Sequence, residues 1–355
     1  MAELAAESVR SVAELNENQW NNVVAQSDQG TLFHRYEWVE AIESGFDVGV
    51  RHAVVEKNGN PIAIMPNFLR ELPLPDGLSE RLPVDPPLRM ASSASPGFGG
   101  PLVISDEQQS LDLLFDALET SIGRHTVFHR LQSFDLTSAR YGQYLESRGY
   151  NPSFNECLFL MDLEQGWETI RENMDKERRK DLRTAREQDY SVTVAPLTDE
   201  LDATYDAYVG NMDRVDGVVL PRDFLERVAA AFDERVLVFT AIVNGVEVGR
   251  YVHLLDDEAS VLHHWLSAVP DAANYEYHPS ELLHARAIQF GVNHGFDEYN
   301  FGKTGAHFDN SVFEFKQKYG ARAVPTFTME KGYSTLAWPL FKFGRTQYRK
   351  RSVRT

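Results

Sequence analysis

Residues 237–255 read LVFTAIVNGVEVGRYVHLL, and residues 53–69 read AVVEKNGNPIAIMPNFL. In each stretch two apolar runs flank an Asn-Gly pair, Asn244-Gly245 in one and Asn58-Gly59 in the other. Asn-Gly between two such runs is the strongest short signal for a β-hairpin. The sequence therefore predicts the same hairpin once in each half of the chain.

A second pair of segments extends this repeat. Residues 141–163 and residues 312–329 each predict a helical turn that ends in a glycine, Gly149 or Gly320, followed by a strand. Internal repetition of this kind indicates a duplicated scaffold. Hairpins followed by alternating helices and strands indicate an α/β fold with a mixed sheet flanked by helices. We expect an N-terminal domain at 10–163, a C-terminal domain at 164–335 that carries the active site, and a basic tail at 336–355.

The charge balance is strongly acidic. The chain has 355 residues, a net charge of -18, and only nine lysines beside 26 arginines. An acidic surface poor in lysine is typical of proteins that work in high salt, where repulsion between carboxylates is screened. The alternative is a mildly acidic cytosolic protein. Either way, the charge disfavours DNA and nonspecific nucleic-acid binding, so a site for a polyanion would have to be local.

Cysteine content and apolar runs bear on location. The single cysteine, Cys157, lies in the apolar run CLFLM and predicts a core residue rather than a nucleophile or a disulfide. The first residues are acidic and do not look like a secretion signal. No run approaches the roughly 20 apolar residues that cross a bilayer. We therefore expect a cytoplasmic protein.

The C-terminal segment departs from the acidic pattern. Residues 338–355 read WPLFKFGRTQYRKRSVRT, in which basic residues follow large apolar ones. Such a segment favours peripheral contact with an anionic membrane surface. The alternative is a basic tail that folds onto the acidic body.

Lysines gather in residues 301–320, FGKTGAHFDNSVFEFKQKYG, which contain Lys303, Lys316 and Lys318. The segment follows a predicted strand, and ligands collect at the carboxyl ends of strands in open α/β sheets. If Lys316 is partly buried beside Phe315, its ammonium would pair with an anion or stabilise a developing oxyanion. The alternative is a surface lysine. The matching positions of the first copy, Tyr144 and Leu145, carry no cation.

A basic helix is predicted around residues 176–186, KERRKDLRTAR. At helical spacing Arg179, Arg183 and Arg186 share one face. Such a stripe suits a diphosphate or an RNA backbone. The alternative is a solvated face paired with the neighbouring acidic residues.

The remaining candidates are single residues. Arg214, in a predicted loop, is a candidate phosphate ligand, and Tyr251 and Tyr277 are candidate substrate contacts. Among His253, His263 and His264, the last two point to opposite faces of one strand, and no zinc motif is present, so we expect no metal. An imidazole such as that of His263 suits a general base because it titrates near neutrality.

Residues 10–335 resemble the FemAB/FemX family and the acetyltransferase-like relatives grouped with the BioF2-like domain. The resemblance rests on four segments, which read GTLFHRYEW, KERRKDLRTARE, HPSELLHARAIQFGVNHGFDEYNFGKT and FEFKQKYG. It implies tandem acetyltransferase (GNAT) domains. It also implies that Phe315 and Lys316 lie near the acyl-transfer centre, with Lys316 in place of the usual tyrosine. Arg214 would contact phosphate, and Arg35 would face the substrate.

The resemblance implies transfer of an acyl or aminoacyl group to an amine, without a tightly bound cofactor. The donor would be acyl-CoA or aminoacyl-tRNA, and the pyrophosphate loop of CoA-binding acetyltransferases is not recognisable. The acceptor would be an amine of a cell-envelope or glycan precursor, either a small molecule or lipid-linked. The alternative is a non-catalytic module of the same fold that binds tRNA or anionic lipid.

Overall fold

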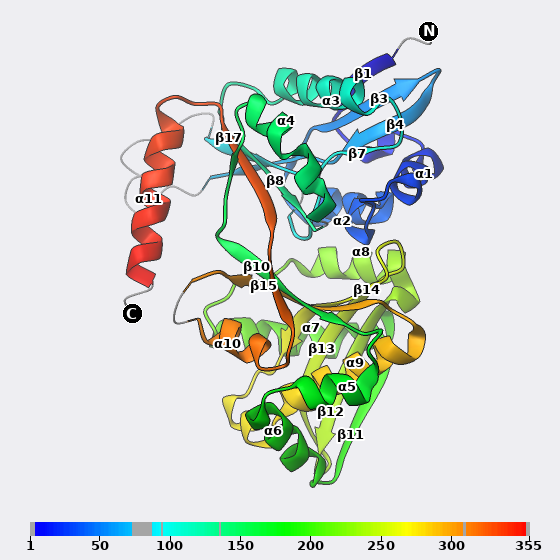
Figure 1. The fold of residues 1–355 in the computed structure, drawn as a ribbon, viewed down its shortest axis with the longest axis vertical. Coiled ribbons are helices and arrows are strands. Elements are labelled where there is room, and N and C mark those ends of the chain that lie inside the picture. Colours follow the sequence, from blue (N-terminus) through cyan, green and yellow to red (C-terminus); the bar gives the residue numbers. More distant parts are fainter. Residues whose placement is uncertain (1–3, 73–86, 94, 135, 308–309, 353–355) are drawn as a thin grey trace. The chain divides into compact units, whose positions relative to one another are not determined.

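The computed structural model describes residues 4–72, 87–93, 95–134, 136–307 and 310–352, with side chains to residue 345 in the last range. The chain forms two compact units. Unit 1 comprises residues 1–154 and 326–355, and unit 2 comprises residues 155–325. Figure 1 shows the elements of both units.

Unit 2 is built on a seven-stranded sheet in which only the β14–β15 pair is parallel. The sheet order is β11 (Tyr190–Pro196), β12 (Val236–Val243), β13 (Val246–Asp256), β14 (Val261–Ala268), β15 (Glu298–Gly305), β10 (Glu156–Asp162) and β16 (Arg322–Pro325). The hairpin predicted at Asn244-Gly245 joins β12 to β13, and both turn residues have positive φ. That backbone conformation is what a type I′ turn requires.

Helices cover both faces of this sheet. One face carries α9 (Pro279–His294), on which α5 (Gly166–Asn173) and α6 (Lys176–Arg186) pack. The other carries α7 (Leu197–Arg214) and α8 (Arg222–Phe232). Side chains alternate along β13: Arg250 bonds Thr204 of α7, and Tyr251 bonds Ser280 of α9. Short elements complete the unit: η4 (Asp233–Arg235), η5 (Ala272–Tyr277) and α10 (Ser311–Gln317).

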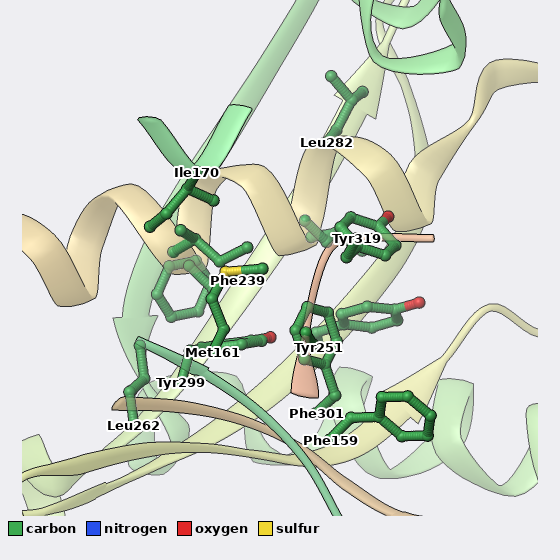
Figure 2. Packing of buried hydrophobic residues seen from close by; sticks show 14 of the residues in the cluster. Phe159, Met161, Ile170, Phe239, Tyr251, Leu262, Leu282, Tyr299, Phe301 and Tyr319 are labelled. Atoms are coloured by element: carbon green, nitrogen blue, oxygen red, sulfur yellow. The ribbon is translucent and has the colours of Figure 1, made fainter. Parts of the chain in front are cut away.

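The core of unit 2 lies between the sheet and α9. Figure 2 shows aromatic side chains of this core gathered beneath Leu282 of α9, among them Tyr251, Tyr299 and Tyr319. Most residues of α9 from Pro279 to Ile288 are buried. The helix begins at Pro279, and proline suits the first turn because it has no N–H that would need a hydrogen-bond partner. From the sequence, Pro279 and Ser280 mark the start of a helix that runs to His294, and the structure has the same bounds.

Unit 1 repeats the plan with two sheets. The four-stranded sheet has the order β1 (Leu4–Val9), β3 (His52–Lys57), β4 (Asn60–Met65) and β7 (Leu102–Val103). The six-stranded sheet has the order β2 (Gly49–Val50), β5 (Phe68–Glu71), β6 (Arg89–Ser92), β8 (Thr126–Ser133), β17 (Phe327–Gly332) and β9 (Asn151–Pro152). The predicted hairpin at Asn58-Gly59 joins β3 to β4.

The main helix of unit 1 is α3 (Glu107–Ser121), which packs on β1, β3 and β4. The other helical elements are η1 (Val12–Glu14), α1 (Glu17–Gln26), η2 (Leu32–His34), α2 (Tyr36–Gly45), η3 (Leu136–Tyr141), α4 (Gly142–Ser147) and α11 (Ala337–Ser352). No helix in the described ranges is long and apolar enough to cross a membrane.

The two units exchange their closing strands. Strand β10 follows the helix of the first copy but lies in the sheet of unit 2, between β15 and β16. Strand β17 follows the helix of the second copy but lies in unit 1, between β8 and β9. The predicted boundaries at residues 163 and 335 divide the chain by its repeat, whereas the contacts divide it at 154 and 325.

Several predicted elements differ from the structure. The sequence of residues 1–25 favours a helix, but Leu4–Val9 form strand β1, because these residues pair with β3. The charged sequence of residues 167–188 favours one continuous helix, but the structure breaks it into α5 and α6 at Asp175, whose side chain caps α6 by accepting from Glu177 N. Residues 71–101 are rich in Pro, Gly and Ser, which predicts a long loop, but Arg89–Ser92 form strand β6. Residues 73–86 and 94 lie outside the described residues.

Candidate active site

The centre of unit 2 is a β-bulge on β15. Parallel pairing between β14 and β15 ends at His263 and Asn300. On the other side of β15, Asn300 pairs with Leu160 and Lys303 with Leu158, so Phe301 and Gly302 together oppose one residue of β10. Gly302 has a φ of +82°, which favours glycine, and its N–H donates to Asn300 Oδ1 at 2.9 Å. The bulge brings two successive carbonyl groups to the same side chain.

That side chain is Lys316. Its Nζ donates to the carbonyl oxygens of Gly302 at 3.0 Å and Lys303 at 3.2 Å. The side chain lies on α10, whose first turn is capped by Asn310, and only 8% of Lys316 is exposed. Burial lowers the pKa of Lys316 to about 8, with the nearby Cys157 thiol acting in the opposite direction. An ammonium has three N–H groups, so these two bonds leave one for a ligand.

Phe315 fixes α10 against its neighbours. The guanidinium of Arg178 on α6 lies 5.2 Å from the centre of the Phe315 ring, and the Tyr319 ring lies 5.2 Å away on another side. Two further contacts join the same helices: Asp175 N donates to Lys318 O at 2.8 Å, and Lys318 Nζ pairs with Glu177 at 2.6 Å. The basic helix and the lysine-bearing helix, both predicted as candidate sites, are therefore tied together.

A histidine cluster lies on the face of the sheet that carries α9, and in it His253 and His284 are buried and His264 is half-buried. The rings of His253, His264 and His284 are 5.0 to 5.2 Å from one to the next, and His253 and His284 both bond the hydroxyl of Tyr299. Burial lowers the pKa of each imidazole, and the Lys316 charge adds to this effect at His264 and His284. These imidazoles are therefore neutral at pH 7 and able to accept a proton.

His263, the predicted general base, points to the other face of β14. It is 3% exposed, with Nε2 at 3.3 Å from Asp256 Oδ2 and Nδ1 at 2.9 Å from Asn300 Nδ2. The imidazole that shares a face with the cluster is His264, whose Nε2 lies 2.9 Å from Ser267 Oγ. The predicted alternation of His263 and His264 is seen, but which face each occupies was not evident from the sequence.

The basic helix forms one wall of a groove of about 440 Å³. Its lining is Leu182 and six cations: Arg171, Lys176, Arg179, Lys180, Arg183 and Arg186. Arg183 is 72% exposed on its side chain, whereas Arg186 is stacked 5.4 Å from the Trp167 ring and its buried Nε has no hydrogen-bond partner in the structure. Arg179 donates to Glu172 O at 2.7 Å. In an acidic chain this groove concentrates positive charge.

The other predicted site residues of unit 2 lie in different surroundings. Arg214 is the last residue of α7 rather than part of a loop, and it donates to Val269 O, Asn211 Oδ1 and Tyr275 OH. Tyr251 is buried and donates to Ser280 Oγ at 2.8 Å, while Tyr277 is half-buried in η5. The Lys303 side chain is exposed.

Arg35 lies in unit 1, at the N-terminal end of α2, where it pairs with Glu37 at 3.0 Å. Its guanidinium is about a fifth exposed.

One group in the described residues has metal-ligand spacing. Asp181, His278 and Glu281 offer ligand atoms within 4.8 Å of one another. Arg178 already pairs with both carboxylates, with Asp181 at 2.9 Å and with Glu281 by a short contact. Burial raises the pKa of Glu281 although Arg178 opposes it. These acids therefore serve to hold Arg178 beside Phe315.

Sequence reasoning missed His284 and Tyr299 as neighbours of the lysine. The sequence did contain a signal for His284. In a helix that begins at Pro279, His284 lies one turn after Ser280 and therefore on the same buried face of α9. The cross-strand pairing of His253 with His264 depends on a bulge in β14 at Trp265, which no residue pattern indicated.

Comparison with known proteins fits this architecture. Residues 170–317, which hold α10 and most of unit 2, match the family model of the acetyltransferase (GNAT) domain. No curated protein sequence is significantly similar to the chain.

Solved structures extend the likeness to both units. FemX superposes with a TM-score of 0.67 at 12% identity, covering 93% of this chain and 98% of its own. The C-terminal domain of a putative lysylphosphatidylglycerol synthetase from Agrobacterium fabrum gives a TM-score of 0.58 at 14% identity, covering 95% and 96%. A tandem GNAT protein from the clavulanic acid biosynthesis pathway superposes with a TM-score of 0.53 at 12% sequence identity. The match covers 94% of this chain and 99% of that protein.

The chain therefore has the fold of FemX and of a tandem GNAT protein, and residues 170–317 match the GNAT domain. The resemblance seen in the sequence is confirmed, as is the predicted α/β class with two GNAT-like domains. The matched domain model is that of an acetyltransferase, and Lys316 lies within the matched residues.

Proposed function

We propose that the protein is an N-acyl- or aminoacyltransferase that moves an acyl group from a thioester or ester to an amine of a cell-envelope or glycan precursor. The observation that carries this proposal is Lys316, a buried ammonium held by two bulge carbonyls in the domain that matches the GNAT model. Burying a cation is costly unless it is used or well paired, so a packing role explains it poorly.

The role of Lys316 follows from the negative charge that develops on the acyl carbonyl oxygen during transfer. The amine nitrogen attacks the acyl carbonyl carbon, a C–N bond forms, and the carbonyl oxygen becomes an oxyanion. Lys316 donates its remaining N–H to that oxygen, and one good donor of this kind contributes about 3 kcal/mol. The C–S or C–O bond then breaks, and the oxyanion electrons restore the carbonyl. The amine proton passes to a base, and the leaving group takes up a proton.

An imidazole or the substrate itself removes the amine proton. His263 was the candidate from the sequence, but the geometry favours His264, because it shares the histidine cluster whose pKa values respond to the Lys316 charge. A neutral imidazole at pH 7 has the form that accepts a proton. Its lowered pKa makes it a weak base, so we expect a contribution at the lower end of the range for general bases, about 100-fold.

The basic groove on α6 suits the phosphates of the donor. Both acyl-CoA and aminoacyl-tRNA are polyanions, and arginine guanidinium groups bind phosphate in a bidentate manner. Arg179 and Arg183 would contact these phosphates, and Arg214 would hold a further one. Lys303, Tyr251, Tyr277 and Arg35 are proposed as substrate contacts. No resident cofactor is needed for this reaction.

The acceptor is proposed from the names of the similar structures. The lipid named for the Agrobacterium protein, lysylphosphatidylglycerol, carries an aminoacyl group, and FemX shares the fold over the whole chain. Both favour an envelope precursor, soluble or lipid-linked, in a cytoplasmic or membrane-peripheral setting. The acidic composition is typical of halophilic proteins and suggests an archaeal source, in which peptidoglycan is absent. A nucleotide- or lipid-linked amino sugar is therefore the favoured acceptor.

The groove also supports a second candidate, a non-catalytic module that binds tRNA or anionic lipid. One experiment separates the two. The purified protein is incubated with acetyl-CoA or with a mixture of aminoacyl-tRNAs, together with free, nucleotide-linked and lipid-linked amino sugars, and amide products are sought by mass spectrometry. A new amide that requires the protein supports the transferase. Tight binding of tRNA or lipid with no product from any pair supports the binding module.

A further inference from the structure

Helix α11 presents two apolar faces, and only one of them is covered by unit 1. On the inner face, Trp338 and Phe341 stack on Phe128, with ring centres 4.7 and 5.1 Å apart. Val127 and Leu72 complete this cluster. In Figure 1, α11 is the red helix, which belongs to unit 1 with β8.

A buried ion network fixes the rotation of the helix. Arg345 donates through both terminal nitrogens to Glu330 of β17, at 2.8 and 2.7 Å, and Arg130 of β8 bonds the same carboxylate at 2.9 Å. Glu330 is 4% exposed. Burial alone would raise its pKa, but the two arginines hold the pKa below its usual value. The helix is therefore anchored, and its outer face is a defined surface.

That outer face carries large apolar side chains. Leu336 is 73% exposed, Leu340 64% and Phe343 66%. Leu340 and Phe343 are three residues apart on one side of α11, and Leu336 lies in the turn that leads into the helix. We call these three side chains the apolar stripe. Exposing three large side chains side by side is unfavourable in water, and such patches mark interaction surfaces.

Charge indicates what covers the stripe. Residues 337–355 contain six lysines and arginines and no acidic residue, while the whole chain carries -18, so residues 1–336 carry -24. Lys342 is exposed on α11, and residues 349–351, further along the sequence, read RKR. The stripe is thus flanked by cations in an otherwise acidic protein.

We propose that the outer face of α11 docks on an anionic lipid surface, with Leu336, Leu340 and Phe343 entering the boundary between headgroups and acyl chains. Cations beside an apolar stripe are what such a surface binds. A nucleic acid would leave the apolar side chains in water. A second copy of the chain would bring two clusters of like charge together. The proposal is independent of the catalytic function proposed for unit 2.

Vesicle flotation of the full-length protein tests it. The probes are vesicles of phosphatidylglycerol with phosphatidylcholine, and vesicles of phosphatidylcholine alone. The test variant is Leu340→Glu with Phe343→Glu. The control is Phe154→Glu, since Phe154 is 72% exposed elsewhere in unit 1. All of these side chains are exposed, so circular dichroism should show folded protein in each case.

The wild type and the control should float with the anionic vesicles and not with the neutral ones. The double variant should bind at least about tenfold more weakly, and raising the salt from about 0.1 M to 1 M should weaken wild-type binding. A wild type that stays unbound, or a double variant that floats equally well, would overturn the proposal. A dimer seen by sedimentation that the double variant dissociates, without vesicle binding, would assign the face to a second copy instead.

Discussion

Leu145 and Lys316 occupy equivalent positions in the two copies of the scaffold. Each lies near the end of the short closing helix, α4 or α10, and each precedes by four residues a glycine in the left-handed region, Gly149 at φ +88° or Gly320 at φ +83°. Leu145 is 1% exposed and packs in the core of unit 1, and Lys316 is 8% exposed. The same buried position therefore holds an apolar side chain in one copy and an ammonium in the other.

The comparison of Leu145 with Lys316 shows which side chain the packing at this position requires. A leucine satisfies the fold at this position, so the lysine is not required for folding. Retaining a buried cation where an apolar residue would serve costs stability, and such costs are characteristic of functional sites.

The first prediction concerns this cost and its pH dependence. Because the pKa of Lys316 is lowered from 10.5 to about 8, the unfolded chain binds more protons than the folded one between these pH values. The free energy of unfolding should therefore rise with pH across this window, by about 3 kcal/mol at most for this residue. Lys316→Met should lack that rise. Urea unfolding of both proteins at several pH values from 7 to 10.5 measures the difference.

Lys318→Met is the control for that experiment. Lys318 lies two residues away, is exposed, and has its pKa raised by the hydrogen bond and charge of Glu177. Its removal should not reduce the gain in stability above pH 8. Parallel pH profiles for the wild type and Lys316→Met would show that Lys316 is not desolvated.

A second prediction concerns the bulge glycine. A Cβ on Gly302 would lie 3.2 Å from His264 O and 3.9 Å from Lys316 Nζ, in a backbone conformation that alanine adopts at a cost. Gly302→Ala should lower the free energy of unfolding by about 1–2 kcal/mol and also lower the rate of acyl transfer, because the carbonyls that hold Lys316 shift.

Gly245→Ala provides the matched control. Gly245 has a similar φ of +77°, but a Cβ there would meet no atom within 4 Å. It should lose comparable stability and keep its transfer rate. Equal rates for the two variants would mean that the bulge does not position Lys316.

A third prediction addresses the donor groove. Arg179→Glu with Arg183→Glu replaces two cations of the groove and should weaken donor binding by at least about tenfold at low salt, with a smaller dependence of affinity on salt. Titration calorimetry with acetyl-CoA and with tRNA measures this and shows which donor depends on the groove. Arg227→Glu, an exposed arginine of α8 outside the groove, is the control. Unchanged affinity for both donors would exclude the groove as the phosphate site.

A fourth prediction distinguishes the two neighbouring histidines. His264→Gln should reduce kcat by about 100-fold if its imidazole accepts the amine proton. His263→Gln should have a much smaller effect on kcat, because His263 faces Asp256 on the other side of the sheet. Steady-state rates of both variants, with thermal melts to confirm folding, provide the measurement. A larger loss for His263→Gln would restore it as the base, and no loss for either would leave proton removal to the substrate.

Local signals predicted much of the fold. Both Asn-Gly hairpins, the bounds of α9 and the strand at 126–133 follow from patterns of a few residues. The exchange of β10 and β17 between units did not follow, because both are apolar strands and the choice of partner depends on contacts distant in sequence. The helix α7 extends to Arg214 because no glycine or proline interrupts it between Gly210 and that residue.

The candidate site was predictable only where local sequence patterns define it. The position of Lys316 and its contrast with Leu145 were visible in the repeat. The carbonyls that hold it were not, since the bulge at Gly302 depends on the register between β10 and β15. The histidine cluster likewise depends on the register between β13 and β14.

The central claim is that Lys316 stabilises the oxyanion of acyl transfer, and its most direct test is the turnover of Lys316→Met. The rate is measured with the donor and acceptor pair identified by mass spectrometry, beside Leu145→Met as the equivalent change in unit 1. We predict a loss of at least about 100-fold in kcat for Lys316→Met and less than a twofold change for Leu145→Met. Wild-type turnover by Lys316→Met would contradict the account.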